Sequence, residues 1–576
     1  YEKWCTDPYF DEATKAELKA IAGDDKEIED RFYRTLEFGT AGLRGVIGAG
    51  TNRMNIYTVR QATQGLANYI LSQGEDAVKR GVAIAHDSRN MHDEFTDATA
   101  LCLAANGIKT YVFPQLAPVP ELSYAVRTLG TIAGVVITAS HNPREYNGYK
   151  VYWEDGAQVT PPHDTSIMAE VAKVTSFDQV KTMDKAAAIE AGLYNVISDE
   201  VEEGYFGELR KLSIHPEIIK AMAKDIKIVY TPLHGTGLRP VQRVLKDMGF
   251  ENVYIEPSQA VPDGNFPTCP YPNPENPDAW KLALELAKEK DADIVLATDP
   301  DADRLGCYAK DSKTGEYKVF TGNMSGSLLC EYEVSQMKEK NGSLPADGAI
   351  IKTIVTTNMV DAIAKYYGTD LIECFTGFKN IGREILRFEQ TGKGTYLFGF
   401  EESYGCLIGT HARDKDAVVA TMALCEAAAY YRGQGKTLWD AMMDMYEKYG
   451  YYVDDIKTVT LKGVEGSKKI GHIMNILRAN VPEEVAGYKT RVVRDYRLEY
   501  IRNIETGEVK PTGFPNANVL YYELENDAWL AVRPSGTEPK IKFYYGIKGS
   551  SYDEAQKESA AFGDKVMDLI YDILEK

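Results

Sequence analysis

The sequence lacks the features that would place the chain in a membrane, on a nucleic acid or in a disulfide-bonded scaffold. Its 576 residues contain no uninterrupted apolar run approaching the ~18 residues that a membrane helix needs. Eight cysteines are scattered without a CxxC pair, so neither a disulfide framework nor a zinc site is expected. A formal net charge of −20 argues against binding to nucleic acid or to an anionic membrane.

The first ten residues lack the basic start and the apolar stretch of a secretory signal. Together with the unpatterned cysteines, this predicts a cytoplasmic protein. Because 85 Asp plus Glu outnumber 65 Lys plus Arg, any anionic substrate must meet a local cluster of cations.

What the sequence does contain is an alternation of short, β-branched apolar runs with amphipathic helical stretches, which predicts α/β layers. The strands expected in three successive blocks include Val82–Ala85, Ile132–Ile137, Ile226–Tyr230, Asp293–Ala297, Ala349–Thr353 and Thr395–Phe400. After about Tyr452 this alternation ends, and the sequence predicts a helix, then strands and a long terminal helix. We therefore expect three consecutive α/β domains with mixed or mostly parallel sheets and a C-terminal α+β domain, around a central cleft. The expected bounds are 1–212, 213–315, 316–450 and 451–576.

A serine-containing loop, TASHNP over Thr138–Pro143, directly follows one of the predicted buried strands. A serine there would project from the carboxyl end of a parallel sheet, where sites of such folds lie. The alternative is a plain hydrogen-bonded turn that ends in Asn-Pro.

An acidic loop, TDPDADR over Thr298–Arg304, also follows a predicted strand. The carboxylates of Asp299, Asp301 and Asp303 alternate along an extended segment, so they converge on one side and favour a hard cation. Mg²⁺ is the leading candidate because few protein oxygens are offered and a phosphate would complete its octahedron. A calcium-hand loop is excluded, since Arg304 stands where that loop needs Gly and Lys310 where it needs Glu. A solvated acidic turn is the remaining alternative.

Two further loops offer groups suited to sugars and phosphates. Glu401, Ser403 and their neighbours in GFEESYG carry carboxylate and hydroxyl groups that would hold sugar hydroxyls, although a helix-capping sequence uses the same residue types. The segment RPSGTEPK begins at Arg533 and combines a bidentate cation with hydroxyl and backbone donors, although an ordinary turn has a similar composition.

Taken together and in this order, the four loops resemble the signatures of the α-D-phosphohexomutase superfamily, which includes phosphoglucomutase and phosphomannomutase. The segment FGTAGLRG, from Phe38 to Gly45, also resembles the N-terminal loop of that family. The resemblance implies that Ser140 is carried as phosphoserine and that Mg²⁺ bridges its phosphate to Asp299, Asp301 and Asp303. It assigns Ser140, Lys150 and Arg44 to catalysis. Substrate binding is assigned to Arg304, Thr376, Gly377, Lys379, Glu401, Ser403, Arg533, Ser535, Gly536 and Thr537.

The implied reaction moves a phosphoryl group between two hydroxyls of one phosphosugar through a bisphosphorylated intermediate. The segment Thr376–Lys379 resembles the glucose-type specificity loop, so we expect glucose 1-phosphate and glucose 6-phosphate as substrates and glucose 1,6-bisphosphate as activator and intermediate. Phosphopentomutase and phosphomannomutase activities are the alternatives. A non-catalytic sugar-phosphate sensor and a metal-dependent phosphatase are rivals from other classes. We expect a monomer or a homodimer.

Two further features have a functional and a simpler structural interpretation. Arg413 and Lys415 follow the GFEESYG segment, here called the sugar loop. They would add phosphate contacts, but a solvated charge cluster is the simpler interpretation. His141 could orient the serine loop or be a structural histidine, and its role stays open.

Overall fold

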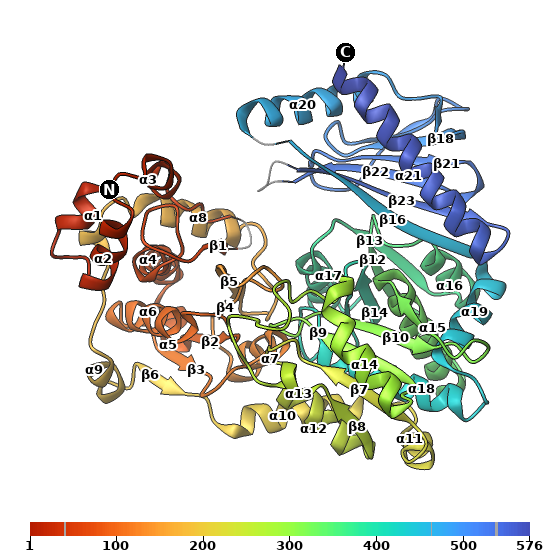
Figure 1. The fold of residues 1–576 in the computed structure, drawn as a ribbon, viewed down its shortest axis with the longest axis horizontal. Coiled ribbons are helices and arrows are strands. Elements are labelled where there is room, and N and C mark those ends of the chain that lie inside the picture. The colour runs from red at the N-terminus through yellow and green to blue at the C-terminus, as the bar shows by residue number, and fades with distance from the viewer. Residues whose placement is uncertain (40–41, 462, 536–539, 576) are drawn as a thin grey trace. The chain divides into compact units, whose positions relative to one another are not determined.

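The computed structural model describes residues 1–39, 42–461, 463–535 and 540–575 (Figure 1). The chain divides into two compact units. The first comprises Tyr1–Ala349 with Gly377–Trp439, and the second comprises Ile350–Thr376 with Asp440–Lys576. No helix in the described ranges is both long and apolar enough to cross a membrane.

The N-terminal sheet of the first unit has the strand order β1-β5-β4-β2-β3-β6. Strands β2, β3, β4 and β6 are parallel, whereas β5 runs antiparallel to β4 and β1 antiparallel to β5. The strands are β1 (Gly42–Val46), β2 (Val82–His86), β3 (Thr110–Val112), β4 (Ala133–Ile137), β5 (Tyr146–Trp153) and β6 (Tyr194–Val196). Every residue of β2 and β4 is buried, as expected for central parallel strands covered on both faces.

Alternate residues of these central strands enter two separate cores. Ile84 and Val135 pack with α4 (Ile56–Ser72) and α6 (His92–Ala105), whereas Ala83 and Val136 pack with α7 (Val119–Leu129). This period of two places helices on both faces of the sheet. The other helices of this region are α1 (Glu2–Thr6), α2 (Glu12–Ala20), α3 (Asp25–Phe32), α5 (Glu75–Arg80), α8 (His163–Lys173), α9 (Lys185–Glu190) and α10 (Asp199–Lys211).

A second sheet of the first unit has the strand order β11-β10-β9-β7-β8. Its parallel strands are β7 (Lys227–Thr231), β8 (Asn252–Ile255) and β9 (Ile294–Thr298), and its antiparallel ones are β10 (Leu305–Lys310) and β11 (Tyr317–Phe320). Helices α11 (Pro216–Met222), α12 (Leu238–Met248), α13 (Pro257–Ala260) and α14 (Lys281–Lys290) belong to the same stretch of chain. The first unit also contains α15 (Gly322–Asn341), α17 (Phe378–Thr391), the hairpin β14 (Thr395–Glu401) and β15 (Gly405–Leu407), and α18 (Ala417–Arg432).

The second unit is built around an antiparallel sheet with the strand order β16-β23-β22-β21-β18-β19-β20, beside which β17 (Glu484–Val485) pairs with β18. One face packs against α20 (Gly463–Ala479) and α21 (Tyr552–Glu575), and the other packs against segments of 350–376. The strands are β16 (Tyr451–Thr460), β18 (Tyr488–Asp495), β19 (Tyr500–Asn503), β20 (Val509–Pro511), β21 (Leu520–Leu524), β22 (Trp529–Pro534) and β23 (Lys540–Gly549). The second unit also contains helix α16 (Met359–Tyr367) and strand β13 (Asp370–Cys374). The division between the units falls within β12 (Gly348–Thr353) and within α19 (Leu438–Tyr449). The predicted α/β class and the C-terminal α+β region are confirmed.

Candidate active site

The serine loop begins where β4 ends and is held in a strained conformation. Ser140 is a buried residue with φ 54°, in the left-handed region that non-glycine residues seldom adopt. Its backbone N–H donates to Thr138 Oγ1 at 2.8 Å. Its hydroxyl donates to Asp299 Oδ2 at 3.0 Å and lies 3.2 Å from His141 Nδ1. The predicted nucleophile and the acidic loop therefore meet within the first unit.

His141 stays neutral in this position. Burial, followed by the positive charges of Arg304 and Arg44, lowers the pKa of its imidazole well below the ordinary value. A neutral ring has one nitrogen that accepts a hydrogen bond, so Nδ1 is able to accept from the Ser140 hydroxyl when that hydroxyl turns from Asp299.

A fully buried arginine that the sequence analysis missed fixes the backbone of the serine loop. The Arg89 guanidinium donates to the carbonyl oxygens of Ser140 and Asn142, both at 2.6 Å, and to those of Pro143 at 2.9 Å and Tyr146 at 3.0 Å. Four charge-assisted hydrogen bonds from one rigid group define the path of the loop.

Asp87 holds this arginine in place. Its carboxylate accepts from the Arg89 N–H at 2.9 Å and from Thr138 Oγ1 at 2.6 Å, and its Oδ2 lies 3.3 Å from Arg89 Nε. Asp87 follows β2 as Ser140 follows β4, and the two strands are parallel neighbours. The sequence signal was therefore present, because polar residues after adjacent buried parallel strands gather at one sheet edge.

We predict that Arg89→Met destabilises the first unit by about 3–5 kcal/mol, because the variant leaves a buried carboxylate and four carbonyl groups without their donor. Thermal unfolding and hydrogen exchange of the amides in 138–147 measure the effect, and both should report a loosened loop. Arg210→Met is the control, since the Arg210 pair with Asp247 is half-exposed and should cost about 1 kcal/mol or less. Unchanged exchange in the serine loop would contradict the role given to Arg89.

The acidic loop begins where β9 ends and gathers three buried carboxylates. Oxygens of Asp299, Asp301 and Asp303 lie within 4.8 Å of one another. The Oδ1 atoms of Asp301 and Asp303 are buried without a hydrogen-bond partner among the described residues. Unsatisfied carboxylate oxygens in a low-dielectric site are costly, so the cluster fits a hard divalent cation. The alternative of a solvated acidic turn is wrong, because these side chains are buried.

Two lysines neutralise part of this charge. Lys150 Nζ lies 2.9 Å from Asp301 Oδ2, and Lys415 Nζ lies 3.2 Å from Asp303 Oδ2. Burial opposes ionisation of Asp301, but the adjacent Lys150 outweighs it and holds the pKa of that carboxyl below its usual range. Burial, followed by the charges of the other two aspartates, raises the pKa of Asp299 well above its usual value. The three carboxyl groups thus differ in acidity.

Lys415 and Arg413 are not the solvated cluster that the simpler interpretation suggested. Both side chains are largely buried, Lys415 between Asp303 and Asp414 and Arg413 in an ion pair with Glu389. Lys415 thus belongs to the site, whereas Arg413 is bound to a structural partner. The spacing of the two residues in the sequence could not show that their side chains have different partners.

The remaining predicted residues of the first unit lie around this centre. Arg44 on β1 donates to Asn142 Oδ1 at 2.9 Å, and the Arg304 N–H donates to Asp299 Oδ1 at 3.1 Å. Lys150 lies on β5 opposite Val136 of β4, so the strand register carries it towards the acidic loop.

The sugar loop is a hairpin. Glu401 ends β14 opposite Gly405 of β15, so the helix-capping alternative is wrong. The Glu401 carboxylate accepts from the Gly377 N–H at 2.7 Å, which joins the sugar loop to the specificity loop. Lys379 lies 3.9 Å from Asp164 Oδ2. Ser403 is half-buried in the hairpin turn, and Thr376 is half-buried next to Gly377.

The segment that begins at Arg533, here called the phosphate loop, belongs to the second unit and begins at the end of β22. Arg533 pairs in register with Lys542, and the Ser535 N–H donates to the Lys540 carbonyl at 2.8 Å. Both Arg533 and Ser535 are half-buried. Gly536 and Thr537, predicted to complete the loop, lie outside the described residues.

A buried glutamate stands close to the acidic loop. The Val119 N–H at the start of α7 donates to the Asp301 carbonyl at 3.0 Å, and Glu121 lies two residues further on. Neither carboxylate oxygen of Glu121 has a hydrogen-bond partner among the described residues, and Arg239 Nη2 is 3.8 Å from Oε2. Burial raises the pKa of Glu121 to about 7, although Arg239 opposes the shift.

We predict that Glu121→Gln removes a pH dependence of stability. The folded chain holds the Glu121 proton more tightly than the unfolded chain, so its stabilising effect is complete below about pH 4.5 and is lost as the pH rises to about 7. The variant should therefore be more stable than the parent by up to about 3 kcal/mol near pH 8 and about equal near pH 4. Denaturant midpoints at the two pH values test this, with the exposed Glu200→Gln as control. A variant with the pH dependence of the parent would refute the assignment.

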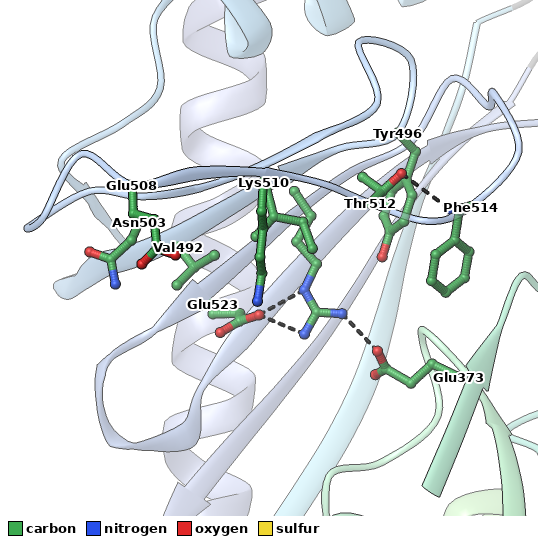
Figure 2. A pocket seen from close by; sticks show the side chains of 11 residues that line it. Glu373, Val492, Tyr496, Asn503, Glu508, Lys510, Thr512, Phe514 and Glu523 are labelled. Carbon is green, nitrogen blue, oxygen red and sulfur yellow. Dashed lines mark hydrogen bonds and ion pairs between the residues drawn. The ribbon is translucent and has the colours of Figure 1, made fainter.

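A separate cavity of about 350 Å³ lies within the second unit, between β18, β19, β20 and β21 (Figure 2). The Arg494 guanidinium crosses it, with Nη1 at 2.8 Å from Glu373 Oε2 and Nε at 2.7 Å from Glu523 Oε1. Glu373 and Glu523 approach this group from opposite sides in Figure 2. The ring of Tyr521 lies 4.8 Å from the guanidinium carbon. The Arg494 guanidinium is thus neutralised by two carboxylates.

We predict that Arg494→Met lowers the stability of the second unit by about 1–3 kcal/mol, because Glu373 and Glu523 lose their shared partner in a half-buried position. Denaturation followed by near-ultraviolet circular dichroism measures the change. Arg491→Met on the same strand is the control, since the Arg491 side chain is 40% exposed and its ion pair with Glu505 should matter little. Equal effects of the two substitutions would contradict this account.

Comparison with known proteins assigns most of the chain to one family. The models of the α/β/α domains I, II and III of phosphoglucomutase/phosphomannomutase match residues 35–178, 203–314 and 321–449. A phosphoglucomutase of Staphylococcus aureus is 35% identical over 542 residues, which are 93% of this chain and 94% of the relative. One of Staphylococcus epidermidis is 34% identical over 528 residues, covering 92% and 93%.

Solved structures share the fold at lower identity. The parafusin (phosphoglucomutase) of Paramecium has a TM-score of 0.68 at 17% identity and covers 94% of this chain and 95% of its own. A phosphoglucomutase/phosphomannomutase family protein of Burkholderia thailandensis has a TM-score of 0.63 at 19% identity and covers 92% and 97%. With the serine loop, the acidic loop and the sugar loop in the family's order, the chain belongs to the phosphoglucomutase/phosphomannomutase family of the α-D-phosphohexomutase superfamily.

Proposed function

We propose that this protein is a phosphoglucomutase, an isomerase that interconverts glucose 1-phosphate and glucose 6-phosphate by intramolecular phosphoryl transfer. The observation that carries the proposal is the hydroxyl of Ser140, which donates to Asp299 at the edge of a buried three-carboxylate cluster. The staphylococcal phosphoglucomutases, related over nearly their whole length, support the choice of reaction.

In the proposed cycle, Ser140 carries a phosphoryl group. The phosphorus bond to the serine oxygen breaks while a sugar hydroxyl oxygen forms a new one, which yields a bisphosphorylated sugar. The intermediate then presents its other phosphate, and Ser140 accepts that group in the reverse step. Phosphoryl transfer depends mainly on alignment and charge neutralisation, which a strained and clamped serine loop serves well.

Three aspartates and two basic residues have distinct proposed roles. Asp299, Asp301 and Asp303 would hold Mg²⁺ next to the phosphorylated serine, and the ion would supply charge neutralisation to the transferring group. Lys150, whose ammonium lies 2.9 Å from Asp301, would give a proton to the leaving serine oxygen and be reprotonated by the proton of the attacking hydroxyl. Arg44 would contact the phosphate from β1.

The substrate contacts are proposed from four loops. Glu401 and Ser403 would hold sugar hydroxyls, and Arg304 would contact the substrate beside the acidic loop. Thr376, Gly377 and Lys379 would recognise glucose, and the Glu401 bond to the Gly377 N–H would keep the two loops in register. The phosphate remote from the reacting centre would bind Arg533, Ser535, Gly536 and Thr537.

The wider setting follows from the same assignment. We propose a cytoplasmic enzyme with glucose 1,6-bisphosphate as activator, acting as a monomer or a homodimer without nucleic-acid or membrane partners. The division of the chain at 212, 315 and 450 into four domains remains part of this proposal.

A coupled assay with glucose 1-phosphate, mannose 1-phosphate and ribose 1-phosphate, each with Mg²⁺ and a trace of the matching bisphosphate, tests the function. We expect the highest kcat/KM with glucose 1-phosphate. A higher kcat/KM with mannose 1-phosphate or ribose 1-phosphate would show that the substrate is not glucose phosphate, and the proposed mutase mechanism would stand. Release of inorganic phosphate without isomer would indicate a phosphatase, and binding without turnover would indicate a sensor.

A further inference from the structure

A second group of potential metal ligands lies in the first unit, where the chain passes from β2 to α6. His86 is the last residue of β2, and His92 and Asp93 form the first turn of α6. The two imidazole rings are stacked, with centroids 4.5 Å apart and planes 12° apart. A short turn therefore brings two histidines and a carboxylate together at the carboxyl edge of the sheet.

The ligand atoms of these residues are close enough to share one ion. One nitrogen from each histidine and one oxygen of Asp93 all lie within 4.8 Å of one another. Asp93 Oδ1 is 3.1 Å from His92 Nδ1 and 3.8 Å from His86 Nε2. Tetrahedral zinc with bonds of ~2.0–2.1 Å separates its ligands by about 3.3 Å. A metal lies in the plane of each imidazole that binds it, so one of the two stacked rings must turn out of the stack before both bind the same ion.

The hydrogen bonding of His86 leaves the appropriate nitrogen available. Its Nδ1 lies 3.0 Å from the Asp87 carbonyl oxygen, which can only accept, so Nδ1 carries the proton and Nε2 keeps its lone pair. This is the arrangement that metal-ligating histidines adopt, with the second nitrogen fixed by a backbone carbonyl. The residue is only 6% exposed, so its ring is held in place by the surrounding chain.

His92 provides a second and independent sign of an absent ligand. Its Nδ1 atom is buried and has no hydrogen-bond partner among the described residues, although Asp93 Oδ1 lies 3.1 Å away. The nitrogen and the oxygen are near each other without the alignment of a hydrogen bond.

We propose that His86, His92 and Asp93 form a binding site for a divalent transition-metal ion, with Zn²⁺ as its natural occupant. Two imidazoles and one carboxylate are a zinc-type donor set with a fourth position open to water, and they disfavour Mg²⁺. The site differs in chemistry from the all-carboxylate cluster of Asp299, Asp301 and Asp303, and it does not depend on the proposed function. The expectation that the chain has no zinc site rested on cysteine spacing, which carries no information about histidines.

Cobalt substitution of the full-length protein tests the proposal. The chelator-treated protein is titrated with Co²⁺ in excess Mg²⁺, which occupies the carboxylate cluster, and the visible d–d absorption is recorded. We expect the intense bands of four-coordinate Co²⁺ with nitrogen ligands, saturation at one ion per chain, and loss of the bands when Zn²⁺ is added. Absence of these bands from the parent protein would overturn the proposal.

Four variants assign the ligands. His92→Gln and Asp93→Asn change residues at the surface-facing start of α6, and each should weaken Zn²⁺ binding by roughly 100-fold. His86→Gln should do the same and is interpreted only if its circular dichroism matches that of the parent. The exposed His472→Gln is the matched control and should bind as the parent does. Full retention of the Co²⁺ bands in His92→Gln would place the metal elsewhere and refute the site.

Discussion

Replacing Ser140 by alanine should abolish interconversion of glucose 1-phosphate and glucose 6-phosphate, with kcat reduced by about 10⁴-fold or more. Ser140 supplies the oxygen that carries the phosphoryl group, and no other hydroxyl is hydrogen-bonded to Asp299 in the described ranges. The coupled assay with Mg²⁺ and a trace of glucose 1,6-bisphosphate measures the rate. Intact-mass spectra should show a phosphorylated fraction in the parent and none in the variant.

The design separates loss of the nucleophile from loss of the fold. Ser140→Ala removes one oxygen and keeps the backbone bonds to Arg89, so its thermal unfolding should resemble that of the parent. The control, Ser72→Ala, changes an exposed serine at the end of α4 and should be fully active. Appreciable turnover by a folded Ser140→Ala protein would rule out the covalent route.

Asp301→Asn should lower kcat by roughly 10³-fold and raise the Mg²⁺ concentration for half-maximal activity by about 10-fold or more. Its Oδ2 atom contacts both Lys150 and Thr138, and its Oδ1 is one of the unsatisfied oxygens. The substitution keeps the shape of the side chain and removes one negative charge. It therefore affects the cation site and the position of the proposed proton carrier together.

Activity measured as a function of Mg²⁺ concentration distinguishes these two effects. If the substitution acts only on cation affinity, saturating Mg²⁺ should restore kcat, whereas loss of Lys150 positioning should persist at saturation. Asp291→Asn, at an exposed carboxylate that pairs with Lys310, is the control and should leave both quantities unchanged. Wild-type kcat and Mg²⁺ response in Asp301→Asn would exclude the acidic cluster from the reaction.

The central strands and the principal loops could be predicted from the sequence because their signals are local. β2, β4 and β9 are short apolar runs that are buried on both faces, and the serine and acidic loops follow two of them directly. The functional groups of each loop come from residues that are adjacent in the sequence, so one segment was enough to predict each loop.

The parts that sequence reasoning missed depend on partners far away in the chain. Arg89 contacts carbonyl groups more than fifty residues later, and carbonyl groups have no sequence signature. Lys415 and Arg413 are two residues apart, yet one faces Asp303 and the other Glu389. Tertiary contacts decided all of these positions.

Arg89 binds the serine loop only through main-chain carbonyl oxygens, and this has a consequence for protein engineering. Since every amino acid supplies the same carbonyl group, the side chain at position 146 can be exchanged without releasing the serine from its place, whereas the Asn142 side chain also accepts from Arg44. Position 89 has no such freedom, because only a guanidinium reaches all four oxygens. A library that randomises position 146 and spares the arginine should therefore yield folded variants at high frequency.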